Sequence, residues 1–138
     1  MFPPNTKFLV VDDFATMRKI IKKVLTELGY TNIEEADDGK PALAILQNAA
    51  GTAAPFNFVI SDWNMPGMAG IDLLKACKGD PKLKNLPFML VTAESEQKNI
   101  VEAAKAGVSD YVVKPFNATT LKGKLERIWA KHNQQSAA

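Results

Sequence analysis

The sequence has almost no cysteine and no long apolar run. Its single cysteine, Cys77, cannot form an internal disulfide, which is compatible with a reducing compartment. No apolar run approaches the roughly 18 residues of a membrane span. The amino terminus has no basic region followed by a long apolar block. We therefore expect a cytoplasmic protein with no signal peptide and no membrane insertion.

A concentrated charge of either sign is also missing. The net charge is +2 and the lysines are scattered along the chain. Proteins that bind nucleic acid usually carry a concentrated basic patch, so we expect no nucleic-acid partner. With one histidine and one cysteine, the chain has no cluster that would favour zinc. The 138 residues, of which 46% are hydrophobic, suit one globular domain with a real core.

What the sequence does contain is a regular alternation of apolar segments and helical patterns. Strand-like segments are followed by stretches whose apolar residues recur at helical spacing. The predicted strands lie at residues 8–11, 32–36, 56–60, 86–92 and 111–113. Residues 48–55 are small and polar, and we interpret them as a surface loop. Strands joined through helices should be parallel, with helices on both faces of the sheet. The sequence therefore predicts an α/β fold of the (βα)5 type, in one domain spanning residues 1–138.

Polar residues fall where the predicted strands end. Asp12 and Asp13 close the first strand, Asp62 the third, Thr92 the fourth and Lys114 the fifth. Taken alone, each of these residues has an ordinary structural role as a turn former, a helix cap or a solvated strand end. Open parallel sheets, however, form their sites at the carboxyl ends of the strands. We expect these five side chains, which come from four strands, to meet at one edge of the sheet.

The chemistry of this set points to phosphoryl transfer. Three neighbouring carboxylates cannot all stay ionised without a cation. Oxygen ligands of this kind select a hard divalent ion such as Mg²⁺, which usually retains waters and phosphate oxygens. A carboxylate beside such an ion can attack phosphorus and form an acyl phosphate. Lys114 can pair with a phosphate oxygen, and Thr92 can donate its hydroxyl to another. We therefore interpret Asp62 as a phosphoacceptor.

Four motifs in the sequence resemble the receiver domain of two-component response regulators, above all its single-domain members in chemotaxis. The motifs cover nearly the whole chain in order, and they are Val10-Val11-Asp12-Asp13-Phe14, Ser61-Asp62-Trp63-Asn64-Met65-Pro66, Val91-Thr92-Ala93-Glu94 and Tyr111-Val112-Val113-Lys114-Pro115-Phe116. The resemblance implies a flavodoxin-like three-layer sandwich with the strand order 2-1-3-4-5. It also implies a cis peptide bond between Lys114 and Pro115.

The resemblance assigns roles to the site residues. Asp62 is the phosphoacceptor, and Mg²⁺ is bound by Asp13, Asp62 and the backbone carbonyl of Asn64, with Asp12 acting through a water. Thr92 and Lys114 contact the phosphoryl group, and Tyr111 is an aromatic switch that turns inward when Thr92 moves. Asn64 and Glu94 tune the access of the hydrolytic water.

The resemblance also implies what the protein does. A histidine kinase donates the phosphoryl group, and the protein catalyses only its own phosphorylation and dephosphorylation. A separate phosphatase is a further expected partner. We expect a receiver without an output domain, and therefore signalling by protein contact, with the flagellar motor switch as target. We also expect a monomer. The resemblance implies a docking surface for an acidic or amphipathic peptide, made of Ile100, Tyr111, Lys122, Lys124 and Arg127. The basic residues of this set are equally consistent with an ordinary solvated helix face.

Two departures and three alternatives stay open at this point. Relatives often carry an acidic residue where this chain has Ala69, which removes a capping carboxylate from the next helix, and the 48–55 loop is longer than usual. A phosphate sink that drains a kinase would share every site residue. A phosphatase of the haloacid dehalogenase type needs an Asp-x-Asp motif, whose second position here is Asn64. A flavodoxin needs a Ser/Thr/Gly-rich phosphate loop, but Asp12 and Asp13 stand in its place.

Overall fold

A five-stranded parallel sheet forms the middle layer of the protein, with helices on both faces. The computed structural model describes residues 2–93 and 97–137. The strands follow the order β2-β1-β3-β4-β5, as the resemblance implies. The elements in chain order are β1 (Phe8–Val11), α1 (Ala15–Glu27), β2 (Ile33–Ala36), α2 (Gly39–Ala50), β3 (Phe58–Asp62), α3 (Gly70–Lys78), β4 (Phe88–Thr92), α4 (Gln97–Lys105), β5 (Asp110–Val113) and α5 (Ala118–Ala137).

The strand positions follow from where each strand can bury its side chains. Every residue of β1, β3 and β4 is buried, as expected for the central strands of a sheet that is covered on both faces. The edge strand β2 exposes Glu34 and Glu35, and charged side chains of this kind are typical of sheet edges. The sequence pattern therefore distinguished the centre of the sheet from its edge.

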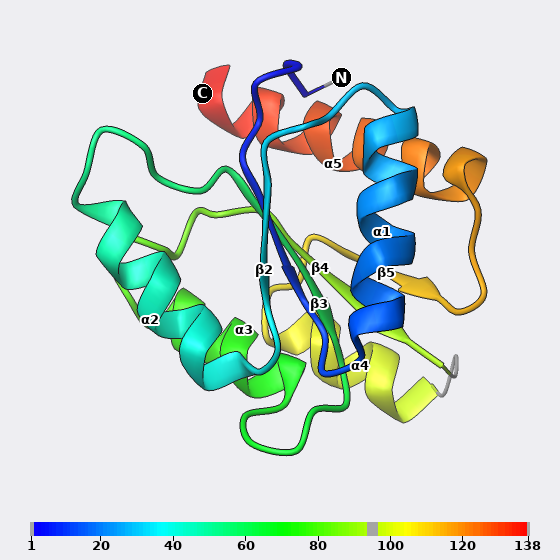
Figure 1. Ribbon diagram of the computed structural model, residues 1–138. Helices are drawn as coiled ribbons and strands as arrows, with labels where there is room; N and C mark the ends of the chain where they lie inside the picture. Colours follow the sequence, from blue (N-terminus) through cyan, green and yellow to red (C-terminus); the bar gives the residue numbers. More distant parts are fainter. Residues whose placement is uncertain (1, 94–96, 138) are drawn as a thin grey trace.

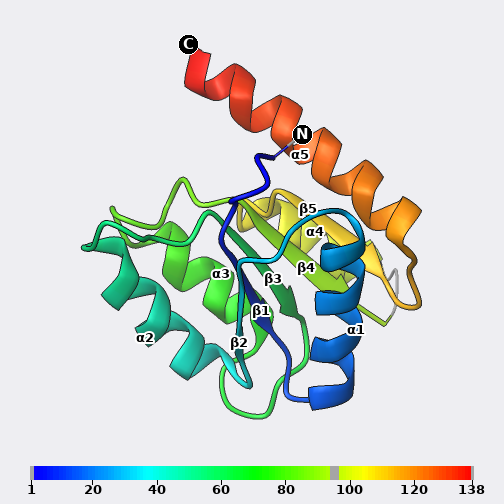
Figure 2. The same ribbon diagram turned by 45° about the horizontal axis from the view of Figure 1, so that its top comes forward.

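The core has two halves because successive strand residues point to opposite faces. Leu9 and Val11 of β1 belong to one buried cluster, together with residues of α2 and α3. Phe8 and Val10 of the same strand belong to the other, together with residues of α1 and α5. Figures 1 and 2 show the same division, with α2 and α3 on one side of the sheet and α1 and α5 on the other.

The third strand and the 48–55 loop differ from the prediction. The predicted strand at 56–60 lies at Phe58–Asp62 in the structure, because β3 pairs with β1 from Phe58 onward and continues beside β4 to Asp62. The helix α2 extends to Ala50, so the loop begins later than predicted. Lys7 ties this loop to β1 by donating from its Nζ to the Ala54 carbonyl at 2.9 Å. Because β3 extends to Asp62, which pairs with Val91 of β4, the backbone of Asp62 is fixed by the sheet.

None of the helices in the described part of the chain is long and apolar enough to cross a membrane.

Gly70, the first residue of α3, allows the helix to begin against the end of β3. Its N–H donates to the Trp63 carbonyl at 2.9 Å. A Cβ at this position would overlap the backbone carbonyl of Asp62 and lie 2.9 Å from Leu90 Cδ2. Since a backbone atom cannot move aside by changing rotamer, a side chain here must displace the strand end or the helix.

We expect the Gly70→Ala substitution to lower the free energy of unfolding by roughly 1–3 kcal/mol, the usual cost of overpacking. Urea denaturation measures this quantity directly. Gly51→Ala is the matched control, because no atom lies within 4 Å of a Cβ at Gly51 and its φ of −91° suits any residue. Equal stability of the two variants would show that the contact between α3 and β3 has room to relax.

Candidate functional site

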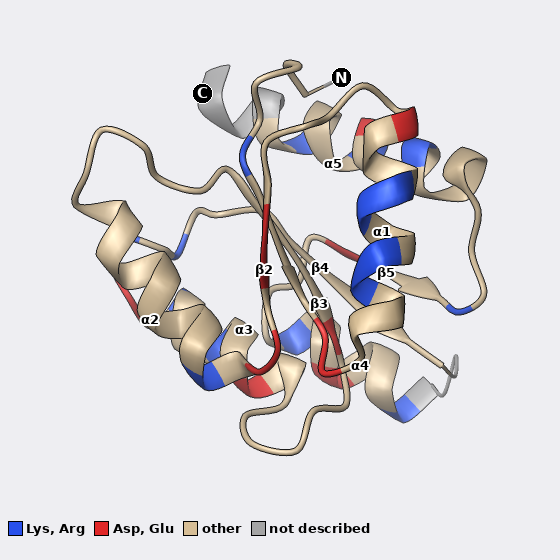
Figure 3. Cartoon of the chain, viewed as in Figure 1, with Lys and Arg blue, Asp and Glu red and all other residues tan. Residues whose placement is uncertain are grey.

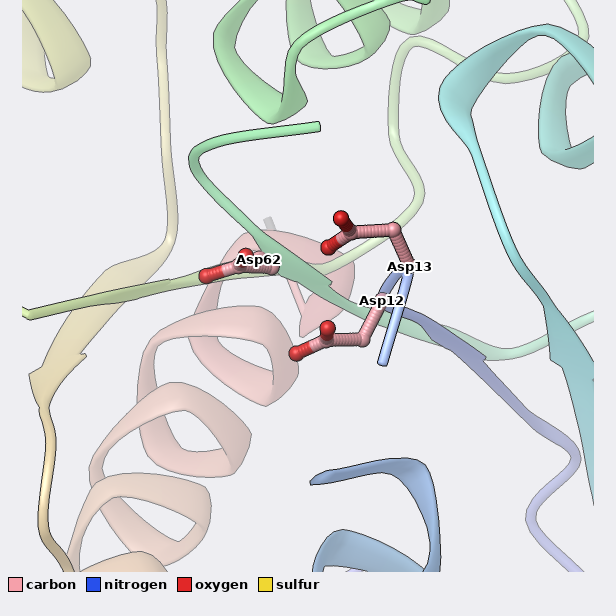
Figure 4. A group of neighbouring side chains, drawn as sticks. All are labelled: Asp12, Asp13 and Asp62. Atoms are coloured by element: carbon pink, nitrogen blue, oxygen red, sulfur yellow. The ribbon is translucent and has the colours of Figure 1, made fainter. Parts of the chain in front are cut away.

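Three carboxylates meet at the edge of the sheet where β1 and β3 end. Asp12 and Asp13 follow β1, and Asp62 is the last residue of β3. One carboxylate oxygen from each lies within 4.8 Å of those from the other two. Figure 4 shows the three side chains next to one another, and Figure 3 shows acidic segments at this edge of the sheet. The expected convergence of these aspartates is therefore present.

Lys114 supplies the positive charge of the site. Its Nζ lies 3.0 Å from Asp62 Oδ1 and 3.8 Å from Asp12 Oδ2. Its backbone N–H donates to the Thr92 carbonyl at 2.8 Å and so places the residue at the end of β5. The bond to Pro115 is cis, as the resemblance implied. One lysine therefore faces two carboxylates, one just after β1 and one at the end of β3.

The acidic charge of the site exceeds what Lys114 can neutralise. Burial raises the pKa of Asp12 and of Asp62, and Lys114 offsets only part of this effect. Among the described residues, Asp12 Oδ2 and Asp13 Oδ1 are buried side-chain atoms without a hydrogen-bond partner. Buried carboxylate oxygens without donors are costly, and a hard cation would satisfy them. The donor set therefore fits Mg²⁺.

Two hydrogen bonds in the turn after β1 fix Asp12. The Phe14 N–H donates to Asp12 Oδ1 at 2.9 Å, and Arg18 Nη1 donates to the Asp12 carbonyl at 2.7 Å. Arg18 also forms an ion pair with Glu35 of β2 at 3.0 Å. Burial acts to raise the pKa of Glu35, but the contacts with Lys22 and Arg18 hold it below its ordinary value. The sequence analysis missed this support, because Arg18 and Glu35 meet only through the order of the strands.

Thr92 and Tyr111 line the same small cavity. Thr92 is buried at the end of β4, and Tyr111 is half-buried in β5. The cavity has a volume of about 10 Å³, and its walls also include Trp63, Ile100 and residues of α4. A space of this size holds about one water. The two predicted switch residues therefore lie together, with little free volume between them.

The other predicted residues lie in the loop after β3, in α4 and in α5. Asn64 is exposed in the loop after β3, and Ile100 of α4 is half-buried. Lys122 and Arg127 of α5 are exposed. Glu94 lies outside the described residues.

Asp110 is a residue of this region that the sequence analysis missed. Lys124 Nζ lies 3.2 Å from Asp110 Oδ1, and an Arg127 nitrogen lies 3.7 Å from Asp110 Oδ2. The same Lys124 nitrogen lies 5.0 Å from the centre of the Tyr111 ring, within the range of a cation–π contact. Asp110 immediately precedes Tyr111 in β5. An acidic residue therefore pairs with two basic side chains of α5, and one of them, Lys124, lies next to the aromatic ring.

Comparison with known proteins identifies the family. A family model described as the response regulator receiver domain matches residues 8–126. The chain belongs to the response regulator receiver family. Chemotaxis protein CheY-3 of Vibrio cholerae is 53% identical over 127 residues, which cover 92% of this chain and 94% of the relative. Chemotaxis protein CheY of Pseudomonas aeruginosa is 54% identical over 127 residues, with 92% of this chain and 98% of the relative covered.

Solved receiver structures share the fold. Chemotaxis protein CheY4 of Vibrio cholerae superimposes with a TM-score of 0.80 at 35% identity, over 90% of this receiver chain and 98% of that chain. The receiver domain of a sensor histidine kinase from Pseudomonas aeruginosa, whose active-site cleft holds a magnesium ion, gives a TM-score of 0.75 at 24% identity. This match covers 89% of the present chain and 96% of that domain.

We expect the Asp12→Asn variant to be more stable to heat than the wild type at pH 7 without added metal. Burial raises the folded-state pKa of Asp12, so its ionised form costs stability at every pH above that value. The amide oxygen can still accept the Phe14 N–H. Scanning calorimetry should show the advantage shrinking as the pH falls through the folded-state pKa toward the ordinary value.

Asp37→Asn is the control, because Asp37 is exposed and its neutralisation should change the unfolding temperature little. Millimolar Mg²⁺ should stabilise the wild type more than the Asp12→Asn variant, because the variant offers one carboxylate fewer. An Asp12→Asn protein that unfolds below the wild type at pH 7 would contradict the electrostatic account.

Proposed function

We propose that this protein is a response regulator that accepts a phosphoryl group on Asp62 from a histidine kinase, with Mg²⁺ as cofactor. Its family and its CheY relatives support this proposal. The observation that carries it is the cluster of Asp12, Asp13 and Asp62, which has two buried oxygens without a hydrogen-bond partner and a lysine 3.0 Å from Asp62. A nucleophile, a cation site and a counter-charge are the parts that phosphoryl transfer requires.

The proposed reaction forms and breaks one bond to phosphorus. A carboxylate oxygen of Asp62 bonds to phosphorus, and the bond between phosphorus and the imidazole nitrogen of the donor breaks. The imidazole leaves with that electron pair and takes up a proton. Water later attacks the same phosphorus, which returns the Asp62 carboxylate and releases inorganic phosphate. The protein therefore catalyses only its own modification and its reversal, without an outside substrate.

Each neighbour of Asp62 has a part in this proposal. Asp13, Asp62 and the Asn64 carbonyl would hold Mg²⁺ directly, and Asp12 would act through a water. The ion neutralises negative charge between the carboxylates and the phosphoryl oxygens when it is bound. Lys114 already pairs with Asp62 Oδ1, so its charge faces the additional negative charge that phosphorylation brings.

We propose that the signal passes through Thr92 and Tyr111 to the output face, defined here as Ile100, Tyr111, Lys122, Lys124 and Arg127. The cavity lined by Thr92 and Tyr111 holds only about 10 Å³, so a shift of Thr92 or α4 would make room for the ring to turn inward. A hydroxyl drawn toward the phosphoryl group would make that shift. Two basic residues of the output face are exposed, which suits an acidic or amphipathic partner. The chemotaxis relatives favour the flagellar motor switch as that partner.

We expect a small phosphodonor and Mg²⁺ to add one phosphoryl group to the wild type, as measured by intact mass spectrometry. The Asp62→Asn variant should remain unmodified, because the amide is a poor nucleophile, and a chelator should prevent the reaction in the wild type. Asp37→Asn should react as the wild type does. Equal modification of the Asp62→Asn variant, at any residue, would show that Asp62 is not the acceptor.

We expect a stable aspartyl-phosphate mimic at Asp62 to increase the binding of a motor switch protein several-fold in a pull-down. Lys122→Glu should weaken that capture, because it reverses a charge of the output face without touching the site. A protein that retains the kinase alone, with and without the mimic, would be a phosphate sink.

A further inference from the structure

Asp38, which precedes α2, holds a loop that belongs to a different part of the chain. Its carboxylate accepts from the Lys40 N–H at 3.1 Å and so caps α2. The same carboxylate accepts from the Gly67 N–H at 3.0 Å and from the Met68 N–H at 3.1 Å and 3.2 Å. These two amides lie 29 and 30 residues away in the sequence. One side chain therefore joins the turn after β2 to residues 64–69, the β3–α3 loop.

The β3–α3 loop is also held by a backbone hydrogen bond at its base and by apolar packing, since Met68 and Ala69 pack against the core. The Gly70 N–H donates to the Trp63 carbonyl at 2.9 Å and closes the base of the loop. The Met65 side chain is buried in the core. Ala69 offers no side-chain hydrogen bond to the start of α3, so the capping carboxylate expected at that position is absent, as the sequence predicts. In the part of the chain that the structure describes, the side-chain hydrogen bonds to the loop all come from Asp38.

Two glycines allow the two loops to touch. A Cβ at Gly67 would lie 2.5 Å from Asp38 Oδ2, and a Cβ at Gly39 would lie 2.6 Å from the Met68 carbonyl oxygen. Neither approach leaves room for a side chain. Burial acts to raise the pKa of Asp38, but the backbone N–H groups of Lys40, Met68 and Gly67 hold it below its ordinary value. The contact is therefore a charge-assisted one between closely fitted loops.

We propose that Asp38 is a positioning residue for the Mg²⁺ site. The β3–α3 loop carries the Asn64 carbonyl, which is the one proposed ligand that is not part of an aspartate side chain. Asn64 is exposed, so burial of its own side chain does not hold it in place. The position of its carbonyl therefore depends on the rest of the loop. Asp38 fixes that loop through the Gly67 and Met68 amides, away from the hydrogen bond between Gly70 and Trp63 that closes it. The inference rests on the proposed function, because it concerns the metal of the same site.

The Asp38→Ser variant separates the two roles of this residue. Serine caps a helix about as well as aspartate does, so the start of α2 is retained, but its shorter side chain cannot reach Gly67 and Met68. Asp80→Ser is the matched control. Asp80 accepts from the backbone N–H of Lys82 at 2.9 Å, two residues on, as Asp38 does from Lys40, and it follows α3 rather than preceding it.

The measurement is the Mg²⁺ dissociation constant, obtained by titrating each folded protein and following the fluorescence of Trp63, the neighbour of Asp62. We expect Asp38→Ser to raise this constant about 10-fold, the lower end of the effect of losing a residue that orients metal ligands. Asp80→Ser should leave it unchanged. In the absence of metal, the Gly67 and Met68 amides of Asp38→Ser should exchange faster with solvent by NMR.

The outcomes separate this inference from the proposed function. A wild type that binds no Mg²⁺, or that binds it equally well after Asp13→Asn, would overturn both. A wild-type dissociation constant in folded Asp38→Ser would overturn the positioning role alone, as would equal weakening by Asp80→Ser. If Asp38→Ser does not fold, Asp38→Asn replaces it, because asparagine retains the cap and one acceptor oxygen. We expect a smaller increase for Asp38→Asn, and no increase would again overturn the inference.

Discussion

The mutual repulsion of three close carboxylates, two of them buried and that of Asp13 half-buried, is the constraint on which the rest of the site depends. Asp12, Asp13 and Asp62 lie close enough to bind one metal ion. The single positive charge of Lys114, which pairs with Asp12 and Asp62, neutralises only part of their negative charge. Folding alone would not favour such a cluster, because burial raises the pKa of Asp12 and Asp62. The arrangement becomes favourable when further positive charge arrives, and this links the site to a cation and to a phosphoryl group.

The fold holds these like charges together through the backbone. Asp62 is still part of β3, so ladder pairing with β1 and β4 fixes its position. Arg18 holds the carbonyl of Asp12 from α1 and is itself anchored to Glu35. Asp38 holds the loop after β3. Each support comes from an element other than the one that carries the charge, so the cluster cannot relax by moving one loop.

A few neighbouring side chains connect the aspartate cluster with the proposed output face. Thr92 and Tyr111 share the walls of one small cavity. Lys124 lies over the Tyr111 ring while it pairs with Asp110. A movement of the ring therefore changes the surroundings of a basic side chain on the surface. This connection gives the proposed signal a physical path from a buried charge to a surface that a partner can contact.

The sequence by itself determined the α/β alternation, the buried central strands and the polar residues at strand ends, since these follow from hydrophobic pattern and chain order. It also carried the motifs that identify the receiver family. Only the tertiary structure decided which charges meet outside those motifs. Asp38 reaches amides about 30 residues away, and Arg18 finds Glu35 on an edge strand. Such contacts depend on the order of the strands and on the lengths of side chains in space, and no local spacing in the sequence records either.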